Sequence, residues 1–144
     1  MSRIEEHMSR YVVTVSPDQT LEVAAQMMIE RSVGSAVITE NGAIEGIVTE
    51  RDVLRAVARG LVPWNTKVVD CMTAKPLTVS PSDNAEEAIQ MMVDGRFRHL
   101  PVVEKGTLVG IVSLRDLMGW RRPLPAPSDA AVEPSQAPAS SRPS

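Results

Sequence analysis

Two stretches of the same form contain the residues best suited to chemistry in this sequence. In each, a glycine is followed three positions later by a hydroxyl residue and six positions later by an aspartate. These residues are Gly46, Thr49 and Asp52 in the first stretch and Gly110, Ser113 and Asp116 in the second. A serine or threonine followed three residues later by an acid is typical of a helix N-terminus, where each side chain bonds a free backbone N–H group. One interpretation is therefore structural: two helix caps, each contributing about 1 kcal/mol.

A second interpretation gives the same residues a ligand. A strand that runs directly into a helix brings free N–H groups, a hydroxyl and a carboxylate to one point. A carboxylate can accept hydrogen bonds from both hydroxyls of a ribose, as the acidic residue of dinucleotide-binding folds does. The glycine at the start of each stretch permits close backbone approach. The residues alone leave both interpretations open.

The elements that position these residues occur twice in the chain. Shifting the sequence by 64 residues aligns it with itself without a gap, and 17 of the 49 pairs between residues 8–56 and 72–120 are identical. The two stretches coincide in this alignment, as do the Thr-Val-Ser-Pro segments at 14–17 and 78–81. Two copies of so long a unit indicate a duplicated domain rather than a solenoid.

Each copy predicts the order β-α-β-β-α, so the expected fold class is α/β with α+β character. Apolar residues at helical spacing follow Thr20 and Asn84, which we expect to act as N-caps. Two apolar strands then flank a glycine-containing turn, and a second helix begins at Thr49 or Ser113. The predicted strands are 12–15, 36–39 and 44–48 in the first copy and 77–79, 100–103 and 108–112 in the second.

The ends of the copies follow from the same patterns. We expect the last helix of the first copy to end at Gly60 and that of the second copy at Pro123. A short helical turn is predicted to open each copy, at 4–8 and 68–72. The predicted division is a first repeat at 1–60, a linker at 61–65, a second repeat at 66–122 and a tail at 123–144. Pro, Ala and Ser supply 16 of the 22 tail residues, so we expect the tail to be disordered.

The composition argues against several classes of protein. The chain has 144 residues, a net charge of −3 and 3% aromatic residues, which disfavours a nucleic-acid surface. One cysteine and two histidines exclude a disulfide framework and a three-histidine metal site. No apolar run is long enough to span a membrane or resembles a signal peptide, so we expect a cytoplasmic protein. The sequence contains none of the common catalytic motifs, and we expect no enzyme.

The duplicated stretches, the β-α-β-β-α order and the segment Arg98-His99-Leu100-Pro101-Val102 together resemble a tandem pair of cystathionine-β-synthase (CBS) domains, the Bateman module. The resemblance covers residues 2–122. It implies two repeats packed sheet to sheet with pseudo-two-fold symmetry. It also implies clefts between the repeats that bind adenosine-type ligands: AMP, ADP, ATP, and in some members NAD or S-adenosylmethionine. No covalent cofactor is implied, and a homodimer is the expected assembly.

The resemblance also implies roles for individual residues. The acid that holds the ribose hydroxyls is matched by Asp52 and Asp116. The hydroxyl residue that helps to orient sugar and phosphate is matched by Thr49 and Ser113. The residues expected to lie along the base are Thr14, Val15, Thr78 and Val79. The other predicted nucleotide-binding residues come from the segment that carries the resemblance and are Arg98, His99 and Pro101.

The two copies differ in and just before this segment. The second copy carries cations at Arg96, Arg98 and His99, where the first copy has Ser32, Gly34 and Ser35. Such cations can bind phosphate, whereas the plainer interpretation is a solvated pair of arginines and a structural histidine. We hypothesise that the two clefts are inequivalent.

Together these features predict a stand-alone regulatory protein. It would bind an adenine nucleotide between its repeats and signal to an unidentified protein partner by a conformational or oligomeric change. The alternative is a structural or interaction module without a ligand, in which the Thr-x-x-Asp pattern is only a helix cap.

Overall fold

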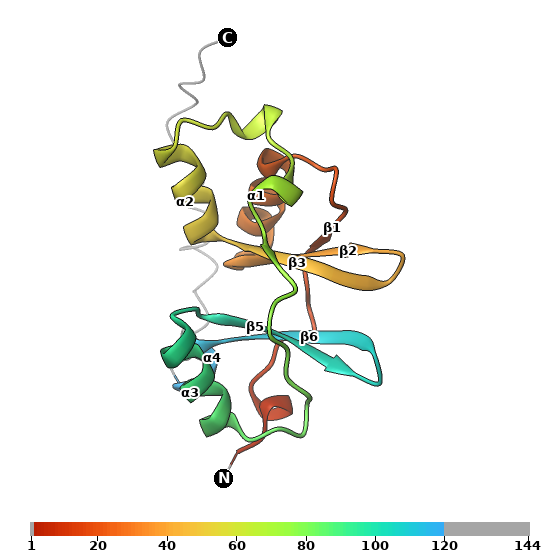
Figure 1. Ribbon diagram of the computed structural model, residues 1–144. Coiled ribbons are helices and arrows are strands. Elements are labelled where there is room, and N and C mark those ends of the chain that lie inside the picture. The colour runs from red at the N-terminus through yellow and green to blue at the C-terminus, as the bar shows by residue number, and fades with distance from the viewer. Residues whose placement is uncertain (1, 120–144) are drawn as a thin grey trace, which may run out of the picture.

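The computed structural model describes residues 2–119, and each repeat follows the predicted order of elements (Figure 1). The elements of the first repeat are η1 (Ile4–Glu6, a short 3-10 helix), β1 (Thr14–Val15), α1 (Leu21–Arg31), β2 (Ser35–Glu40), β3 (Ala43–Thr49) and α2 (Glu50–Ala58). Those that follow are η2 (Pro63–Asn65), η3 (Val68–Asp70), β4 (Thr73–Ala74), α3 (Ala85–Gly95), β5 (His99–Glu104), β6 (Thr107–Ser113) and α4 (Leu114–Leu117). The tail predicted at 123–144 lies outside the described residues.

The two long helices begin and end in the same way. At the start of α1, the Thr20 hydroxyl accepts a hydrogen bond from the N–H three residues on (3.2 Å). At the start of α3, the Asn84 Oδ1 accepts bonds from two N–H groups of the first turn (2.7 and 3.2 Å). Both helices end at a residue in the left-handed conformation, Ser32 (φ 56°) and Arg96 (φ 58°). The two predicted N-caps are confirmed.

Each repeat provides the central hairpin of one sheet, and a segment of the other repeat pairs at its edge. Strands β1, β2, β3 and β4 form the first sheet in that order, with β1 parallel to β2 and the other pairs antiparallel. Strands β5 and β6 form an antiparallel hairpin. Single bridges extend this hairpin on the corresponding sides: Val79 pairs with Val102, and Ser9 pairs with Ile111. The second sheet therefore repeats the arrangement of the first.

The extended segment predicted at 77–79 is shorter than its counterpart in the first repeat. There, the Val37 N–H donates to the carbonyl of Val13 (2.8 Å) and lengthens the pairing beside β1. The equivalent residue in the second repeat is Pro101, which has no N–H to donate. Of the segment, only Val79 is paired, so the prediction of a strand over 77–79 is wrong in its extent.

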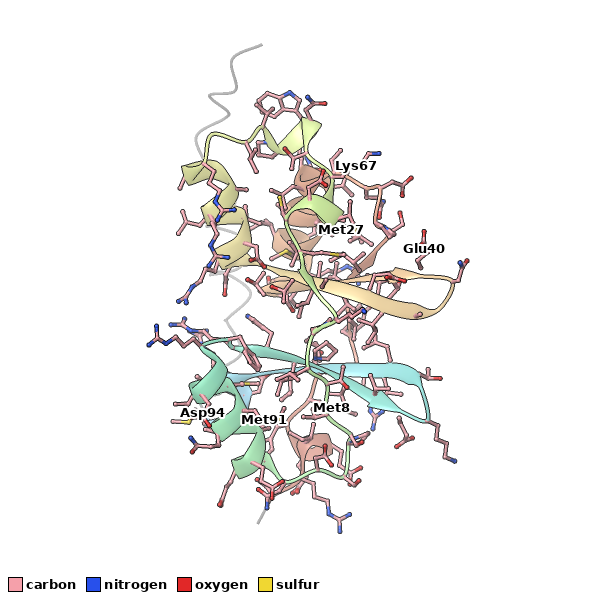
Figure 2. The ribbon with its side chains drawn as sticks, in the orientation of Figure 1. Met8, Met27, Glu40, Lys67, Met91 and Asp94 are labelled. Carbon is pink, nitrogen blue, oxygen red and sulfur yellow. The ribbon has the colours of Figure 1, made fainter. Side chains whose placement is uncertain are left out.

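The opening turn of each repeat packs in the core of the other repeat. Ile4 of η1 is fully buried in the second core, where its N–H donates to the carbonyl of Asp83 (3.0 Å). Met8 also belongs to the first repeat and packs against this second core (Figure 2). Val68 of η3 is fully buried in the first core, where its N–H donates to the carbonyl of Gln19 (2.8 Å). The two repeats are therefore interlocked.

The two sheets face each other across an apolar layer. Val37 and Ile47 of the first sheet pack with Ile111 of the second, surrounded by partly buried aliphatic side chains. Figure 1 shows the sheets stacked, with α1 and α2 on the outer side of one and α3 and α4 on the outer side of the other. Packing of the repeats sheet to sheet with pseudo-two-fold symmetry is thereby confirmed.

The glycines that begin the two Gly-x-x-(Thr/Ser)-x-x-Asp stretches make room for backbone. A Cβ at Gly46 would lie 2.8 Å from the carbonyl of Thr73, and one at Gly110 would lie 2.7 Å from the carbonyl of Ser9. In each case the neighbour is the segment that crosses from an opening turn to the edge of the sheet. These two glycines therefore permit another segment of the chain to pass close to their backbone.

The last helix is shorter than predicted. The sequence pattern placed its end at Pro123, whereas α4 ends at Leu117. The reason is Gly119, which has a φ of +75° and stands where the first repeat has Arg55, a residue inside α2. A glycine in this conformation terminates a helix.

Residues 2–119 lack two kinds of feature. No helix in this range is both long and apolar enough to cross a lipid bilayer. Within the same range, no group of three or more His, Cys, Asp or Glu side chains is placed to hold a metal ion.

Replacing Gly110 by alanine tests the crossing of the opening segment over β6. We expect Gly110→Ala to lower the free energy of unfolding by about 1–3 kcal/mol, the usual effect of overpacking, because the added methyl group meets a backbone carbonyl at 2.7 Å. Urea denaturation measures the change. The control is Gly106→Asn, which adds a side chain where nothing lies within 4 Å and where asparagine tolerates the positive φ. A Gly110→Ala protein as stable as the wild type would contradict this packing.

Candidate functional site

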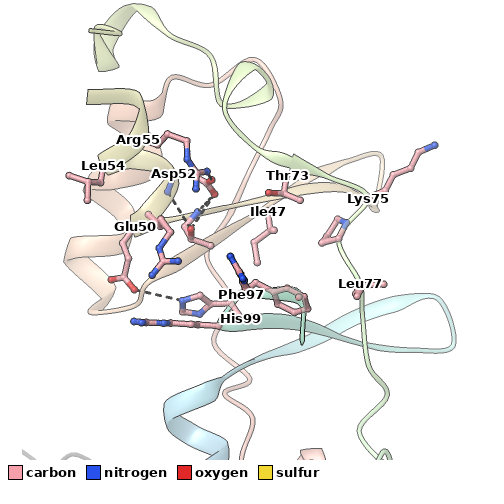
Figure 3. Close-up of a pocket in the computed structure, with 16 residues that line it drawn as sticks. Ile47, Glu50, Asp52, Leu54, Arg55, Thr73, Lys75, Leu77, Phe97 and His99 are labelled. Atoms are coloured by element: carbon pink, nitrogen blue, oxygen red, sulfur yellow. Dashed lines mark hydrogen bonds and ion pairs between the residues drawn. The ribbon is translucent and has the colours of Figure 1, made fainter. Parts of the chain in front are cut away.

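A cleft of about 630 Å³ opens between the two repeats (Figure 3). Its first wall is the junction of β3 and α2, and its second is the loop from α3 into β5. The third wall is the segment 75–77, which passes from the first sheet towards the second. Three segments that are distant in the sequence meet here.

Asp52 is held rigidly at the first turn of α2, with 8% of its surface exposed. Its Oδ2 accepts hydrogen bonds from the N–H and the hydroxyl of Thr49 (2.9 and 3.2 Å), and its own N–H donates to the Thr49 Oγ1 (3.4 Å). Ser113 and Asp116 form the same reciprocal cap at the start of α4. The interpretation of both stretches as helix caps is confirmed.

The cap leaves part of the Asp52 carboxylate available. A carboxylate offers about four lone-pair sites, and Oδ1 makes one contact, with the Arg55 Nη1 at 3.1 Å. The Arg55 side chain is about half exposed (52%), and exposed ion pairs are weak. Oδ1 therefore keeps acceptor capacity for a ligand hydroxyl while Oδ2 caps the helix.

His99, the first residue of β5, connects the two repeats across the cleft. Its Nε2 lies 3.8 Å from the Oε1 of Glu50 in α2, as the dashed line in Figure 3 marks. Burial lowers the pKa of the His99 imidazole below its usual 6.5, and Arg98 acts in the same direction, while Glu50 and Asp116 act against the shift. The imidazole is therefore neutral at pH 7, and its contact with Glu50 becomes an ion pair only on protonation.

The approach of His99 and Glu50 depends on Gly34. A Cβ at Gly34 would lie 2.9 Å from the Glu50 Oε1 and 3.1 Å from the His99 Cε1. The Gly34 carbonyl also accepts a hydrogen bond from the Glu50 N–H (3.1 Å). In the second repeat, the carbonyl of Arg98 accepts the equivalent bond, from the N–H of Leu114 (2.8 Å). The start of each second helix is thus tied to the loop before a strand of its own sheet.

Apolar and cationic side chains line the rest of the cleft. Leu77, with 58% of its surface exposed, and the half-buried ring of Phe97 both line it, in front of the buried Ile47. Arg96 and Arg98 flank Phe97 in the sequence and are exposed. The cleft therefore offers an apolar surface for a flat ring, a carboxylate for hydroxyl groups and guanidinium groups for an anion.

The cleft contains part of the set of site residues predicted from the sequence. Thr49, Asp52, Arg98 and His99 line it. The other predicted residues do not: Thr14, Val15, Thr78, Val79, Pro101, Ser113 and Asp116. Among these, Val15, Val79 and Pro101 are buried inside the repeats. A role in binding for these residues stays a prediction.

Sequence reasoning missed several residues that line the cleft. They include Lys75, Pro76 and Leu77 of the third wall, together with Arg51 and Phe97. The third wall lies immediately before the Thr-Val-Ser-Pro segment that the repeat alignment singled out. Its signal in the sequence is Pro76, which cannot donate to a strand ladder and so favours a connecting segment.

The lowered pKa of His99 predicts how stability depends on pH. The folded protein favours the neutral imidazole of His99. The stability that this group contributes is therefore complete above pH 6.5 and is lost as the pH falls through the lowered pKa. We expect the free energy of unfolding to decrease on acidification below pH 6.5, by at most about 1.4 kcal/mol per pH unit for one proton. His99→Gln removes this group and should therefore show a smaller decrease. Equal slopes in denaturant titrations of wild type and His99→Gln would contradict the shift.

Comparison with known proteins agrees with this architecture. The CBS domain family matches residues 4–59 and 68–122. The CBS domain-containing protein YhcV of Bacillus subtilis (strain 168) is 38% identical over 118 residues, which cover 81% of this chain and 84% of that protein. Three CBS domain-containing proteins of Arabidopsis thaliana, 38–39% identical, are much longer, and this chain spans 19% of their length.

Solved structures with the same fold include two with similar sequences. The CBS-domain containing protein ATU1752 from Agrobacterium tumefaciens has a TM-score of 0.77 at 33% identity, covering 84% of this chain and 100% of that one. The CBS domain protein PAE2072 from Pyrobaculum aerophilum, complexed with AMP, has a TM-score of 0.74 at 33% identity, covering 80% of this chain and 89% of that one. The interlocked pair of repeats and these matches lead to one conclusion: the chain belongs to the CBS domain family and contains a tandem pair of its domains.

Proposed function

We propose that the protein binds an adenosine-type nucleotide in the cleft beside Asp52 and acts as a regulatory module. The observation that carries the proposal is the Thr49–Asp52 junction, which presents a fixed carboxylate oxygen at the edge of a 630 Å³ cleft between the repeats. The AMP bound to the Pyrobaculum aerophilum protein supports the same class of ligand. AMP, ADP and ATP are the first candidates, with NAD and S-adenosylmethionine next.

The residues of the cleft suit the parts of such a nucleotide. The Asp52 Oδ1 would accept the ribose hydroxyls, and Thr49 would orient the sugar. Leu77 and Phe97 offer an apolar surface for the adenine ring. Arg98 would bind phosphate oxygens, with His99 beside it. We extend the proposal to a second nucleotide site at the equivalent cap of Ser113 and Asp116.

Binding would be transmitted by the contacts that cross between the repeats. A ligand that touches α2, the α3–β5 loop and the segment 75–77 favours the arrangement in which all three are correctly placed. The His99–Glu50 contact lies within this group and would adjust with it. The output would be a change in the orientation of the repeats or in oligomeric state, recognised by a protein partner.

A ligand-free interaction module is the second candidate, because both Thr/Ser–Asp caps are complete without any ligand. The melting temperature separates the two candidates. A ligand that binds only the folded protein raises the melting temperature, and the rise continues with the logarithm of the ligand concentration above its dissociation constant. We expect AMP or ATP to raise the melting temperature in a dose-dependent manner in a thermal-shift assay. No response to AMP, ATP, NAD or S-adenosylmethionine would favour the interaction module.

Asp52→Asn tests the proposed ribose contact directly. Hydrogen bonds to a charged acceptor contribute about 1.5–3 kcal/mol, so we expect the dissociation constant for AMP to rise about 10- to 100-fold in isothermal titration calorimetry. Asp116→Asn makes the same change in the equivalent cap at the start of α4 and should weaken AMP binding less, because the main site is assigned to the Asp52 cleft. Equal losses from both substitutions would contradict the assignment of the main site to the Asp52 cleft. Melting temperatures verify that both variants fold.

We also propose a homodimer that covers apolar side chains on the outer helices. Ile29 of α1 and Val93 of α3 occupy equivalent positions and are 80% and 57% exposed. Leu54 of α2 and Met118 after α4 are likewise equivalent, at 69% and 52%. Repetition of the same apolar positions on both halves suits a symmetric contact between copies.

The double substitution Ile29→Lys/Val93→Lys tests the dimer. Two charges in an apolar contact are costly, so we expect the variant to elute as a monomer in size-exclusion chromatography with light scattering. Lysine at the neighbouring exposed positions, in Glu30→Lys/Asp94→Lys, is the control and should leave the wild-type mass unchanged. A dimer that survives the first variant would exclude these positions from the contact.

A further inference from the structure

The Asp52 cleft is rich in cations although the chain as a whole is acidic. The protein has 15 Lys and Arg against 18 Asp and Glu. The acidic residues lining the cleft are Glu50 and Asp52. The basic residues lining it are Arg51, Arg55, Lys75, Arg96 and Arg98. The charge of the cleft is therefore opposite in sign to that of the whole chain.

Several of these cations lack an acidic partner. Arg55 is paired with Asp52 at 3.1 Å, and the ammonium group of Lys75 points away from Asp52 (Figure 3). Within residues 2–119, no ion pair is formed by Arg51, Arg96 or Arg98. Three exposed guanidinium groups at one cleft repel each other and attract an anion that carries several charges.

The backbone does not require these arginines. Arg96 has a φ of 58°, and the equivalent residue of the first repeat, Ser32, has a φ of 56°, so a small side chain suits the same conformation. Arg98 stands where the first repeat has Gly34, and the carbonyls of both accept the same kind of hydrogen bond, from Leu114 and Glu50. The second repeat therefore carries two positive charges at these positions, whereas the first repeat has the same backbone conformation without them.

We propose that the Asp52 cleft selects nucleoside di- and triphosphates over nucleoside monophosphates. This inference rests on the proposed function and adds the number of phosphates to it. Each phosphate beyond the first adds negative charge and oxygen acceptors, which match the fork of a guanidinium group. The equivalent positions around Asp116 have Ser32 and Gly34 in place of Arg96 and Arg98, so selectivity of this kind is a property of one cleft.

The size of the effect follows from the exposure of the arginines. An exposed ion pair contributes up to about fivefold in affinity, so three guanidinium groups predict that ATP binds about tenfold or more tightly than AMP at low salt. The preference should shrink as salt is added, because exposed charges are screened over about 10 Å at 0.1 M salt.

Isothermal titration calorimetry in EDTA tests the proposal with adenosine, AMP, ADP and ATP at 50 mM and 500 mM salt. The variants are Arg96→Ser, which introduces the residue of the first repeat, and Arg98→Gln. The control is Lys105→Asn, which also removes one positive charge at a left-handed residue (φ 50°) and introduces the residue of the first repeat, Asn41 (φ 54°). Lys105 lies in the β5–β6 turn and does not line the cleft. Melting temperatures verify folding.

In the wild type we expect affinity to increase from AMP to ADP to ATP at low salt. Each arginine variant should weaken ATP binding about three- to fivefold and AMP binding by a smaller factor, whereas Lys105→Asn should leave the binding of both unchanged. AMP binding as tightly as ATP, or equal losses in Lys105→Asn and Arg96→Ser, would overturn the selectivity.

Further outcomes separate this inference from the proposed function. If AMP binds through Asp52 with the affinity of ATP, the selectivity fails while the proposed function stands. If no adenosine compound binds, the proposed function fails and the selectivity with it. Inorganic tripolyphosphate serves as the probe for anion binding alone: binding as tight as that of ATP would overturn a nucleotide site, and binding much weaker than ATP supports one.

Discussion

The structure depends on the exchange of opening turns between its two repeats. Because Ile4 completes the second core and Val68 completes the first, neither core can form fully without the other half of the chain. The exchange also sends two segments across the edges of the sheets, which is possible only where Gly46 and Gly110 carry no side chain. Leu77 becomes the third wall of the cleft because it follows one of these crossings. The cleft is thus a consequence of how the repeats interlock.

The caps at the start of α2 and α4 serve the fold and the site with the same atoms. The reciprocal bonds of Thr49 and Asp52 satisfy backbone groups that would otherwise be unpaired at the start of α2. They also immobilise the carboxylate, so that a ligand would meet an oxygen whose position is already set. Preorganisation of this kind reduces the ordering that binding would require. The structural and the ligand interpretations of the pattern are therefore compatible.

Pseudo-symmetry of the backbone coexists with asymmetry of the side chains. The left-handed ends of α1 and α3 are nearly superposable in conformation, yet one carries Ser32 and the other Arg96. Similarly, Pro101 shortens a strand pairing that Val37 makes in the first repeat, and Gly119 ends a helix that Arg55 continues. A duplicated fold can in this way keep one scaffold while its two halves differ in charge and length.

Local patterns in the sequence are enough to predict the duplication, the resemblance to the family and most of the elements. Helical spacing after Thr20 and Asn84 and the caps at the second helices depend on residues within a few positions of each other, so local patterns predict them. Two features emerge when distant segments pack together: η1 and η3 exchange cores, and Arg98 and His99 of the second repeat line the cleft of Asp52. The physical reason is that such contacts join segments distant in the chain, and their pairing is set by how the two cores pack, which local spacing does not record.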